Sequence, residues 1–321
     1  MNKFKDSKYL ILGTIGILII SSELFVYLYS PVSAHNFSIN ESAAFLAMTD
    51  ELKAEVQLVQ QNSANNNMSM ASEHADKAIA LLSENATKEI AERNQRLADD
   101  LQMVLISIKA STESAPSNDI SSDIGFLVSD AGAIIDEIVT ARIDPDQLNN
   151  STIQALAIVE LLDKVLSNYG DAYAVGFDMT NMSNLMMGDR SSMSSTGMVS
   201  DNISMSNMSS SVGSKLLNVS AYQDAQALAM KVQERFDSQL MDTSVAQNSG
   251  TAGQSGKNIV TALQELITSI NSRAPPMDIM TIVHTKIHPN LITAFDLIMG
   301  DMNSMSSMGI ANDNISMNSI T

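Results

Sequence analysis

The sequence predicts an all-α protein, built as one or two antiparallel helical bundles, and three observations lead to this fold class. Apolar residues recur every three or four positions through most of the chain, which is the spacing of one helix face. No segment alternates apolar and polar residues with the period of two that a half-buried strand requires. Amphipathic helices joined by short turns bury their apolar stripes most simply against one another.

The first half of the chain carries four stripes, separated by polar or proline-containing breaks. Asn62 to Met70 interrupts the first, Pro116 followed by Ser117-Asn118-Asp119 ends the second, and Asp144-Pro145 turns the chain after the third. Ser151 or Thr152 can cap the fourth. The helical segments expected here are 41–59, 72–108 with a kink near Asn85, 120–138 and 151–166.

The second half is expected to contain three helices. Gln247 to Gly256 is expected to be a polar linker after the first of them, and Pro275-Pro276 precedes the last, since proline suits a first helical turn. The expected segments are 222–240, 259–270 and 277–298. A weaker sequence similarity suggests that the helical parts are themselves duplicated; it relates Leu101 to Ile120 with Leu263 to Ile279.

A methionine-rich stretch occurs twice. The segment Leu185 to Ser209 (the first module) and the segment Leu297 to Thr321 (the second module) share 14 of 25 positions without a gap. Ser, Asn, Gly and Met dominate both, and such a composition does not supply enough apolar surface to offset the entropy of ordering. We therefore expect flexible, unpacked segments there. The expected organisation is 1–34 signal peptide or anchor, 41–176 helical bundle, 177–217 first module with its flanks, 218–298 second bundle and 297–321 second module.

Composition excludes several classes of function. The net charge of −18 leaves no basic stripe for a nucleic acid, so no nucleic-acid partner is expected. The absence of cysteine excludes disulfides and thiolate metal sites. No nucleophile elbow, phosphate-binding glycine loop or zinc-protease motif is present, so an enzyme is not expected. The side chains that could bind a soft metal ion are therefore the 22 methionines and four histidines.

The N-terminus indicates export. Lys3, Lys5 and Lys8 precede the apolar run Tyr9 to Ile20, and Val32-Ser33-Ala34 fits a signal-peptidase site. Apolar residues resume after Glu23, so a retained membrane anchor is the alternative to cleavage. In both cases the rest of the chain is expected outside the cytoplasm, secreted, on the cell surface or anchored to the membrane.

Eleven Asn-X-Ser/Thr triplets follow residue 35 and none precedes it, which favours a surface glycoprotein. They lie at Asn36, Asn40, Asn67, Asn85, Asn149, Asn150, Asn181, Asn202, Asn207, Asn218 and Asn314. Many acceptor sites without cysteine are typical of archaeal or bacterial surface proteins. A chain rich in Asn and Ser also forms such triplets by chance.

One pattern resembles a known family. Tyr169-x-x-Ala172-Tyr173-x-x-Gly176, followed later by Ala221-Tyr222-x-x-Ala225, resembles the extracytoplasmic helical region of bacterial high-affinity iron permeases, within residues 151–298. The family has Asp and Glu where this sequence has Asn168 and Ala221, and transport does not carry over. The resemblance implies a periplasmic-type helical bundle and metal traffic.

The modules are the candidate metal-binding segments. Methionine thioether is a soft, neutral ligand that suits Cu(I), and thioethers a few residues apart can converge on one ion. The candidate ligands are Met179, Met182, Met186, Met187, Met193, Met205 and Met208 in or beside the first module, and Met299, Met302, Met305 and Met308 in the second. Inert spacers, an oxidant sink or a partner-binding surface remain alternative interpretations.

Histidine offers further candidates. His284 and His288 are four apart on an expected helix, which can place two imidazoles on one face for a metal. Pro289 disfavours helical geometry at His288 and can spoil the pairing, and a half-buried, satisfied His284 is the plainer interpretation. His74 carries no recognisable pattern. His35 becomes a chelating N-terminal residue if cleavage follows Ala34.

Together these features predict an extracytoplasmic protein that binds, stores or delivers Cu(I) through clustered methionines. Two alternatives remain open at this point. One is a structural or interaction glycoprotein of the envelope whose Met/Ser segments are spacers. The other is an iron-binding accessory bundle that uses carboxylates and His284.

Overall fold

The structure, a computed structural model, describes residues 35–113, 118–176, 178–180, 215–241 and 250–297, and it confirms the all-α class. No strand occurs among these residues. The expected N-terminal signal or anchor segment, the whole of the first module and nearly all of the second lie outside them. The helices are α2 (Ile39–Ala64), α3 (Met68–Leu81), α4 (Glu84–Thr112), α5 (Asn118–Arg142), α6 (Pro145–Leu148), α7 (Ser151–Ala172), α10 (Val219–Arg235), the π-helix η2 (Phe236–Leu240), α12 (Thr251–Asn271), α13 (Pro276–Ile282), the π-helix η3 (Val283–Ile287) and α14 (His288–Phe295).

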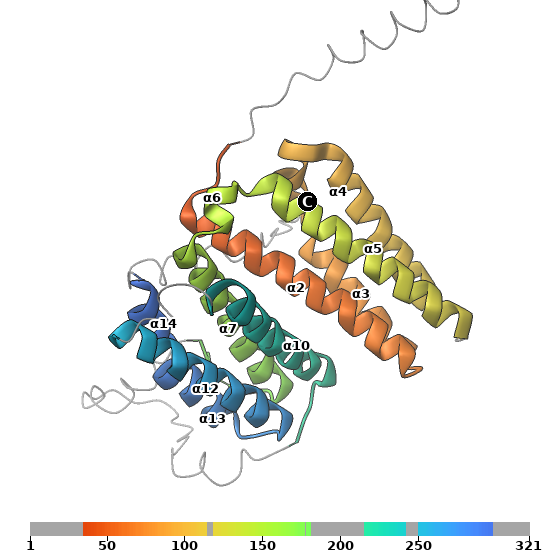
Figure 1. The fold of residues 1–321 in the computed structure, drawn as a ribbon. Coiled ribbons are helices and arrows are strands. Elements are labelled where there is room, and N and C mark those ends of the chain that lie inside the picture. Colours follow the sequence, from red (N-terminus) through yellow and green to blue (C-terminus); the bar gives the residue numbers. More distant parts are fainter. Residues whose placement is uncertain (1–34, 114–117, 177, 181–214, 242–249, 298–321) are drawn as a thin grey trace, which may run out of the picture.

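The described helices form two groups that share one hydrophobic core. In the first group α2, α3, α4 and α5 run back and forth beside one another, and in the second α7 and α10 pack against α12, α13 and α14 (Figure 1). The groups join where α2 lies against both α7 and α10. Residues of both helical regions expected from the sequence therefore contribute to one core.

Helix α7 is the most enclosed element. Every residue from Ile153 to Val159 is buried, so all sides of this part of the helix are covered. Farther along, Tyr169 packs against Tyr173 and Tyr222, and its hydroxyl donates to the carbonyl of Ala274 at 2.7 Å. The tyrosines of the permease-like pattern therefore pack α7 and α10 together and tie them to the turn after α12.

Several element boundaries differ from the expected ones. Helix α2 begins at Ile39, because Ser38 and Glu41 form a reciprocal capping box. The break expected near Asn85 comes at Leu82 and Ser83, where Ser83 caps α4, and a separate kink occurs at Asn94, whose φ and ψ are −156° and 96°. The polar segment Thr251 to Gly256, expected to be linker, is the first part of α12, and its small residues Gly253, Ser255 and Gly256 are buried.

The expected helix 277–298 is divided. Pro289 has no N–H to donate, and its ring crowds the carbonyl four residues earlier, which belongs to Thr285. The wider π-turn of η3 lies over this position, and the His288 N–H donates to the carbonyl of Val283. Helix α14 then ends at Phe295, followed by Asp296 with a left-handed φ of 51°.

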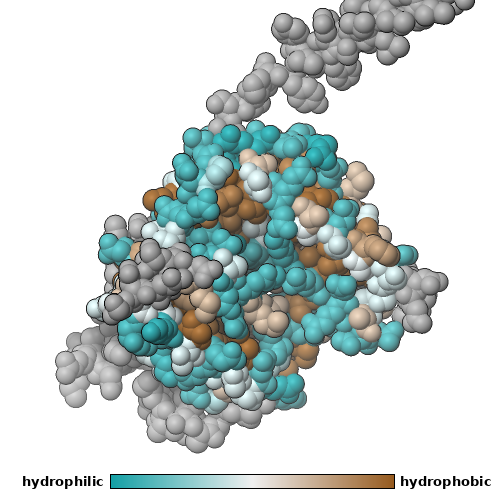
Figure 2. All heavy atoms as spheres, in the orientation of Figure 1, coloured by the Kyte–Doolittle hydropathy of each residue, from teal (hydrophilic) through white to brown (hydrophobic). Residues whose placement is uncertain are grey.

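The surface of the described bundle is polar over much of its area. Figure 2 shows hydrophilic residues over most of the face seen in Figure 1, with hydrophobic residues between them in patches. None of the helices in the described part combines the length and the apolar character needed to cross a membrane.

Asp163 of α7 reduces the stability of the fold when it is ionised. Burial, together with the nearby carboxylates of Glu160 and Asp178, raises the pKa of Asp163 to about 7 from a usual 3.8. The folded protein therefore disfavours the ionised form of Asp163. As the pH rises from 4 to 7, the unfolded chain releases this proton while the folded chain keeps it, so the free energy of unfolding falls.

Replacing Asp163 with Asn should stabilise the protein at pH 8 by on the order of 2 kcal/mol, because the amide has no charge to desolvate. The gain should shrink as the pH falls and vanish near pH 4, where the unfolded chain also binds the proton. Denaturant unfolding at the two pH values measures it, with the exposed Asp171→Asn as the control on the same helix. An equal effect at both pH values would contradict the assignment.

Candidate functional site

A buried group of ionisable side chains lies where α2, α3 and α10 meet. His74 of α3 has no exposed side-chain surface, and its Nδ1 lies 2.8 Å from Glu55 Oε2 and 3.2 Å from Asp224 Oδ1. The ammonium group of Lys77 contacts the other oxygen of Asp224 at 2.5 Å and the hydroxyl of Ser220 at 2.5 Å. Three ligand-type atoms, from Glu55, His74 and Asp224, thus lie within 4.8 Å of one another. We call Glu55, His74, Lys77 and Asp224 together the buried cluster.

The hydrogen-bond network around the buried cluster fixes the protonation of His74. Asn62 donates its amide N–H to the Leu58 carbonyl at 2.9 Å, and this bond fixes the orientation of the amide. The Asn62 Oδ1 then accepts from Gln223 Nε2 at 3.2 Å. Gln223 therefore presents Oε1 to His74 Nε2, at 2.8 Å. Because both ring nitrogens face acceptors, the ring carries two protons and a positive charge.

The pKa directions agree with this geometry. Burial alone would lower the pKa of His74, but its contacts with Asp224 and Glu55 outweigh burial and raise that pKa to about 9. Burial raises the pKa of Glu55, and the His74 contact opposes this rise. Burial would also raise the pKa of Asp224, yet the contacts with His74 and Lys77 hold it below its usual value. Two acids thus face two cations, of which His74 is fully buried and Lys77 is partly exposed.

A second His/carboxylate group lies at the N-terminal end of α2. His35 Nδ1 contacts Glu92 Oε2 at 3.0 Å, and the Arg142 guanidinium contacts Glu89 Oε2 at 2.7 Å. Arg142 is 1% exposed and lies over the Phe37 ring at 3.4 Å, so it cannot leave Glu89 for solvent. This group is more exposed than the buried cluster, and its permanent cation competes with any metal ion.

His284 is half-buried and hydrogen-bonded, in line with the plainer interpretation, and His288 lies beside it. The rings of His284 and His288 are in edge contact, with centroids 5.2 Å apart, despite Pro289. His284 Nε2 lies 3.0 Å from the Met179 carbonyl, to which it can only donate, so in the neutral ring Nδ1 carries the lone pair. His288 Nε2 is buried without a hydrogen-bond partner in the described part. Burial and the neighbouring His284 lower the pKa of His288 to about 3.

Met179 differs from expectation. It was expected at the start of an unpacked segment, but it is 2% exposed and packs into the core, so its thioether is not an open ligand. Its sulfur fits because Gly170 has no side chain, and a Cβ there would lie 3.1 Å from the sulfur. The other predicted ligands, Met182, Met186, Met187, Met193, Met205, Met208, Met299, Met302, Met305 and Met308, lie outside the described residues.

The residues on either side of the first module lie together. The N–H groups of Leu217 and Asn218 donate to the Ala172 carbonyl at 2.9 Å and 3.1 Å. The chain therefore leaves the bundle after α7 and re-enters it at the C-terminal end of the same helix.

Several glycosylation triplets have a local structural role. Asn67, Asn150 and Asn218 are the N-cap residues of α3, α7 and α10, and each side chain accepts a hydrogen bond from a first-turn N–H. Helix capping thus accounts for asparagine at these positions whether or not they carry glycans.

Sequence reasoning missed the buried cluster. A usable signal was present, because Ala71, Ala75 and Ala78 form the buried stripe of α3 and His74 lies within it. A histidine inside an apolar stripe needs a partner, but the sequence does not say which acids supply it. Comparisons of the chain with models of protein families, with curated proteins and with solved structures find no match.

Replacing His74 with Leu should destabilise the protein by about 3–5 kcal/mol, because Glu55 and Asp224 would remain buried with one cation fewer. Replacing the partly exposed His35 with Leu is the matched control and should cost less than about 1 kcal/mol. Denaturant unfolding at pH 7 measures both. A His74 variant as stable as the control would show that the ring is not a buried cation.

Proposed function

We propose that the protein binds Cu(I) outside the cytoplasm, as a store or donor, with the helical bundle carrying two methionine-rich modules. The observation that carries the proposal is the contact between His284 and Met179. It ties the histidine pair to the point where the chain leaves the bundle toward the first module. The repetition of the module, 14 of 25 positions identical, supports a common role for both copies.

The histidine pair has the features of a soft, monovalent ion site. A metal-binding histidine commonly donates its second N–H to a backbone carbonyl, as His284 does to Met179. The unpaired Nε2 of His288 is a second nitrogen beside it. Among the described residues, burial and His284 are the causes that lower the pKa of His288, and no carboxylate is among them. A buried site without negative charge favours a singly charged ion over a doubly charged one.

Iron binding by the bundle is the second candidate. Two groups in the described part, the buried cluster and the His35–Glu89–Glu92 group, combine one imidazole with two carboxylates. Oxygen-rich ligand sets favour harder ions than Cu(I). The permease resemblance points in the same direction.

Titration of the purified chain with Cu(I) against a competing chelator should show more than one equivalent bound. Changing Met299, Met302, Met305 and Met308 together to Leu should remove a large part of this binding, because Leu keeps the apolar volume and lacks sulfur. The matched control changes the exposed Met103 and Met230 of α4 and α10 to Leu. Unchanged Cu(I) binding in the fourfold variant would remove the second module from the proposal, and ferric binding that survives in it would favour the iron candidate.

Replacing His288 with Leu should weaken Cu(I) binding about tenfold or more without destabilising the metal-free protein. The buried Nε2 of His288 has no partner in the described part, so an apolar side chain of similar size loses no hydrogen bond there. Chelator competition and thermal unfolding measure the two effects. A variant that unfolds more readily and binds Cu(I) as before would assign His288 to packing and remove it from the site.

A further inference from the structure

The ligand-type atoms of the buried cluster lie about as far apart as neighbouring ligands of one metal ion. In an octahedral site with metal–ligand distances of about 2.1 Å, neighbouring ligand atoms lie about 3.0 Å apart. The distances from His74 Nδ1 to Glu55 Oε2 and Asp224 Oδ1, 2.8 Å and 3.2 Å, bracket that value. Small side-chain movements would therefore bring all three atoms to coordination distance of one ion.

Asp224 supplies an independent sign of a ligand. Its side chain is 4% exposed, and its buried Oδ1 accepts no well-aligned hydrogen bond among the described residues, although it lies 3.2 Å from His74 Nδ1. The single proton on His74 Nδ1 points to Glu55 at the shorter distance, which leaves Oδ1 facing the centre of the cluster. Buried carboxylate oxygens normally accept a hydrogen bond or bind a cation.

The hydrogen bonds around His74 determine which of its ring nitrogens could coordinate a metal ion. Gln223 Oε1 accepts from His74 Nε2 at 2.8 Å, and Asn62 holds that amide in place. This arrangement keeps the proton on Nε2 and turns Nδ1 toward the two carboxylates. Outer-sphere hydrogen bonds of this kind fix the ring orientation of metal-binding histidines.

The charges also suit a divalent ion. Two carboxylates neutralise a 2+ charge, and binding would release the Nδ1 proton of His74 to solvent. Lys77, which now balances Asp224, has a side chain that is 33% exposed and can turn outward. Arg142 in the His35 group has no such freedom at 1% exposure, so the buried cluster is the better site of the two.

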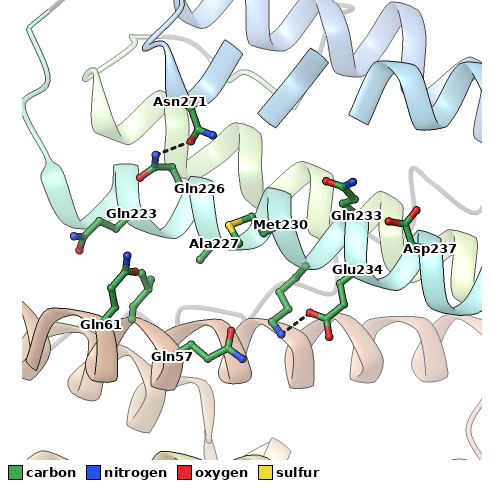
Figure 3. A pocket seen from close by; sticks show the side chains of 12 residues that line it. Gln57, Gln61, Gln223, Gln226, Ala227, Met230, Gln233, Glu234, Asp237 and Asn271 are labelled. Atoms are coloured by element: carbon green, nitrogen blue, oxygen red, sulfur yellow. Dashed lines mark hydrogen bonds and ion pairs between the residues drawn. The ribbon is translucent and has the colours of Figure 1, made fainter. Parts of the chain in front are cut away.

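A groove on the surface lies next to the buried cluster and is separated from it by Gln223. A groove of about 550 Å³ lies between α2 and α10, and its lining includes Gln57, Gln61, Gln223 and Gln226 (Figure 3). Gln223 belongs both to this lining and to the hydrogen bonds of His74. Movement of this one side chain would connect the groove with the cluster.

We propose that Glu55, His74 and Asp224 bind one divalent transition-metal cation that ties α2, α3 and α10 together, reached through the amide-lined groove. The site is independent of the methionine modules. Thioethers serve Zn(II) and Co(II) poorly compared with carboxylates and imidazole, so these two ions are suitable probes.

The test uses the full chain with His35→Asn, which removes the imidazole of the exposed group. After loading with Zn(II) and removal of excess metal, this variant should retain bound zinc and melt at a higher temperature than its metal-free form. Adding Glu55→Gln should remove one equivalent of zinc and the thermal gain. The amide oxygen can still accept from His74 Nδ1, so the metal-free fold is expected to persist. Equal zinc content with and without Glu55→Gln would overturn the proposal.

X-ray absorption of the zinc-loaded His35→Asn chain gives a readout that does not depend on the second variant folding. One imidazole with oxygen ligands is expected. A spectrum with two imidazoles and no carboxylate would place the ion at His284 and His288 instead and overturn the assignment, as would sulfur ligands or the absence of bound zinc. The fourfold methionine variant should bind zinc as the unmodified chain does, so failure of the copper proposal leaves this test unaffected.

Discussion

The ion pairs of His74 are the most deeply buried polar link between the two helical groups in the described part. Glu55 and His74 belong to the first group, whereas Asp224 belongs to the second. Apolar contacts between α2, α7 and α10 supply the area, but they are not directional. A charged ring between two carboxylates specifies one register of three helices, because any slip would leave a buried charge unpaired.

The first module interrupts the second helical group in the chain without separating its helices in space. The second group is built around α7 and α10, which are adjacent in space although the first module separates them in the chain. The Ala172 carbonyl closes that insertion by accepting from both Leu217 and Asn218. An insertion whose ends are fixed together leaves the packing of α7 on α10 undisturbed, which explains how a segment without helical periodicity can interrupt a bundle.

Periodicity predicted the helices well, because the apolar stripe of a helix is visible within a short stretch of the sequence. It predicted boundaries less well where a local interaction decides them, as in the capping box at Ser38 and the π-turn before Pro289. The histidine pair was within reach because His284 and His288 are four apart. The buried cluster was not, since Glu55 and Asp224 lie 19 and 150 positions from His74 and only the folded chain brings them together.

Features that reduce stability gather where the chain leaves the bundle toward the first module. Asp163 is held partly ionised at neutral pH near Asp178, and one residue farther on Met179 meets the histidine pair, where His288 keeps a buried nitrogen unpaired. Leucine or asparagine at these positions would give a more stable bundle. The buried cluster differs, because there each ring nitrogen has an acceptor and the charges balance. The buried Nε2 of His288, which has no hydrogen-bond partner in the described part, is a place at this end of the bundle where a ligand can supply the missing partner.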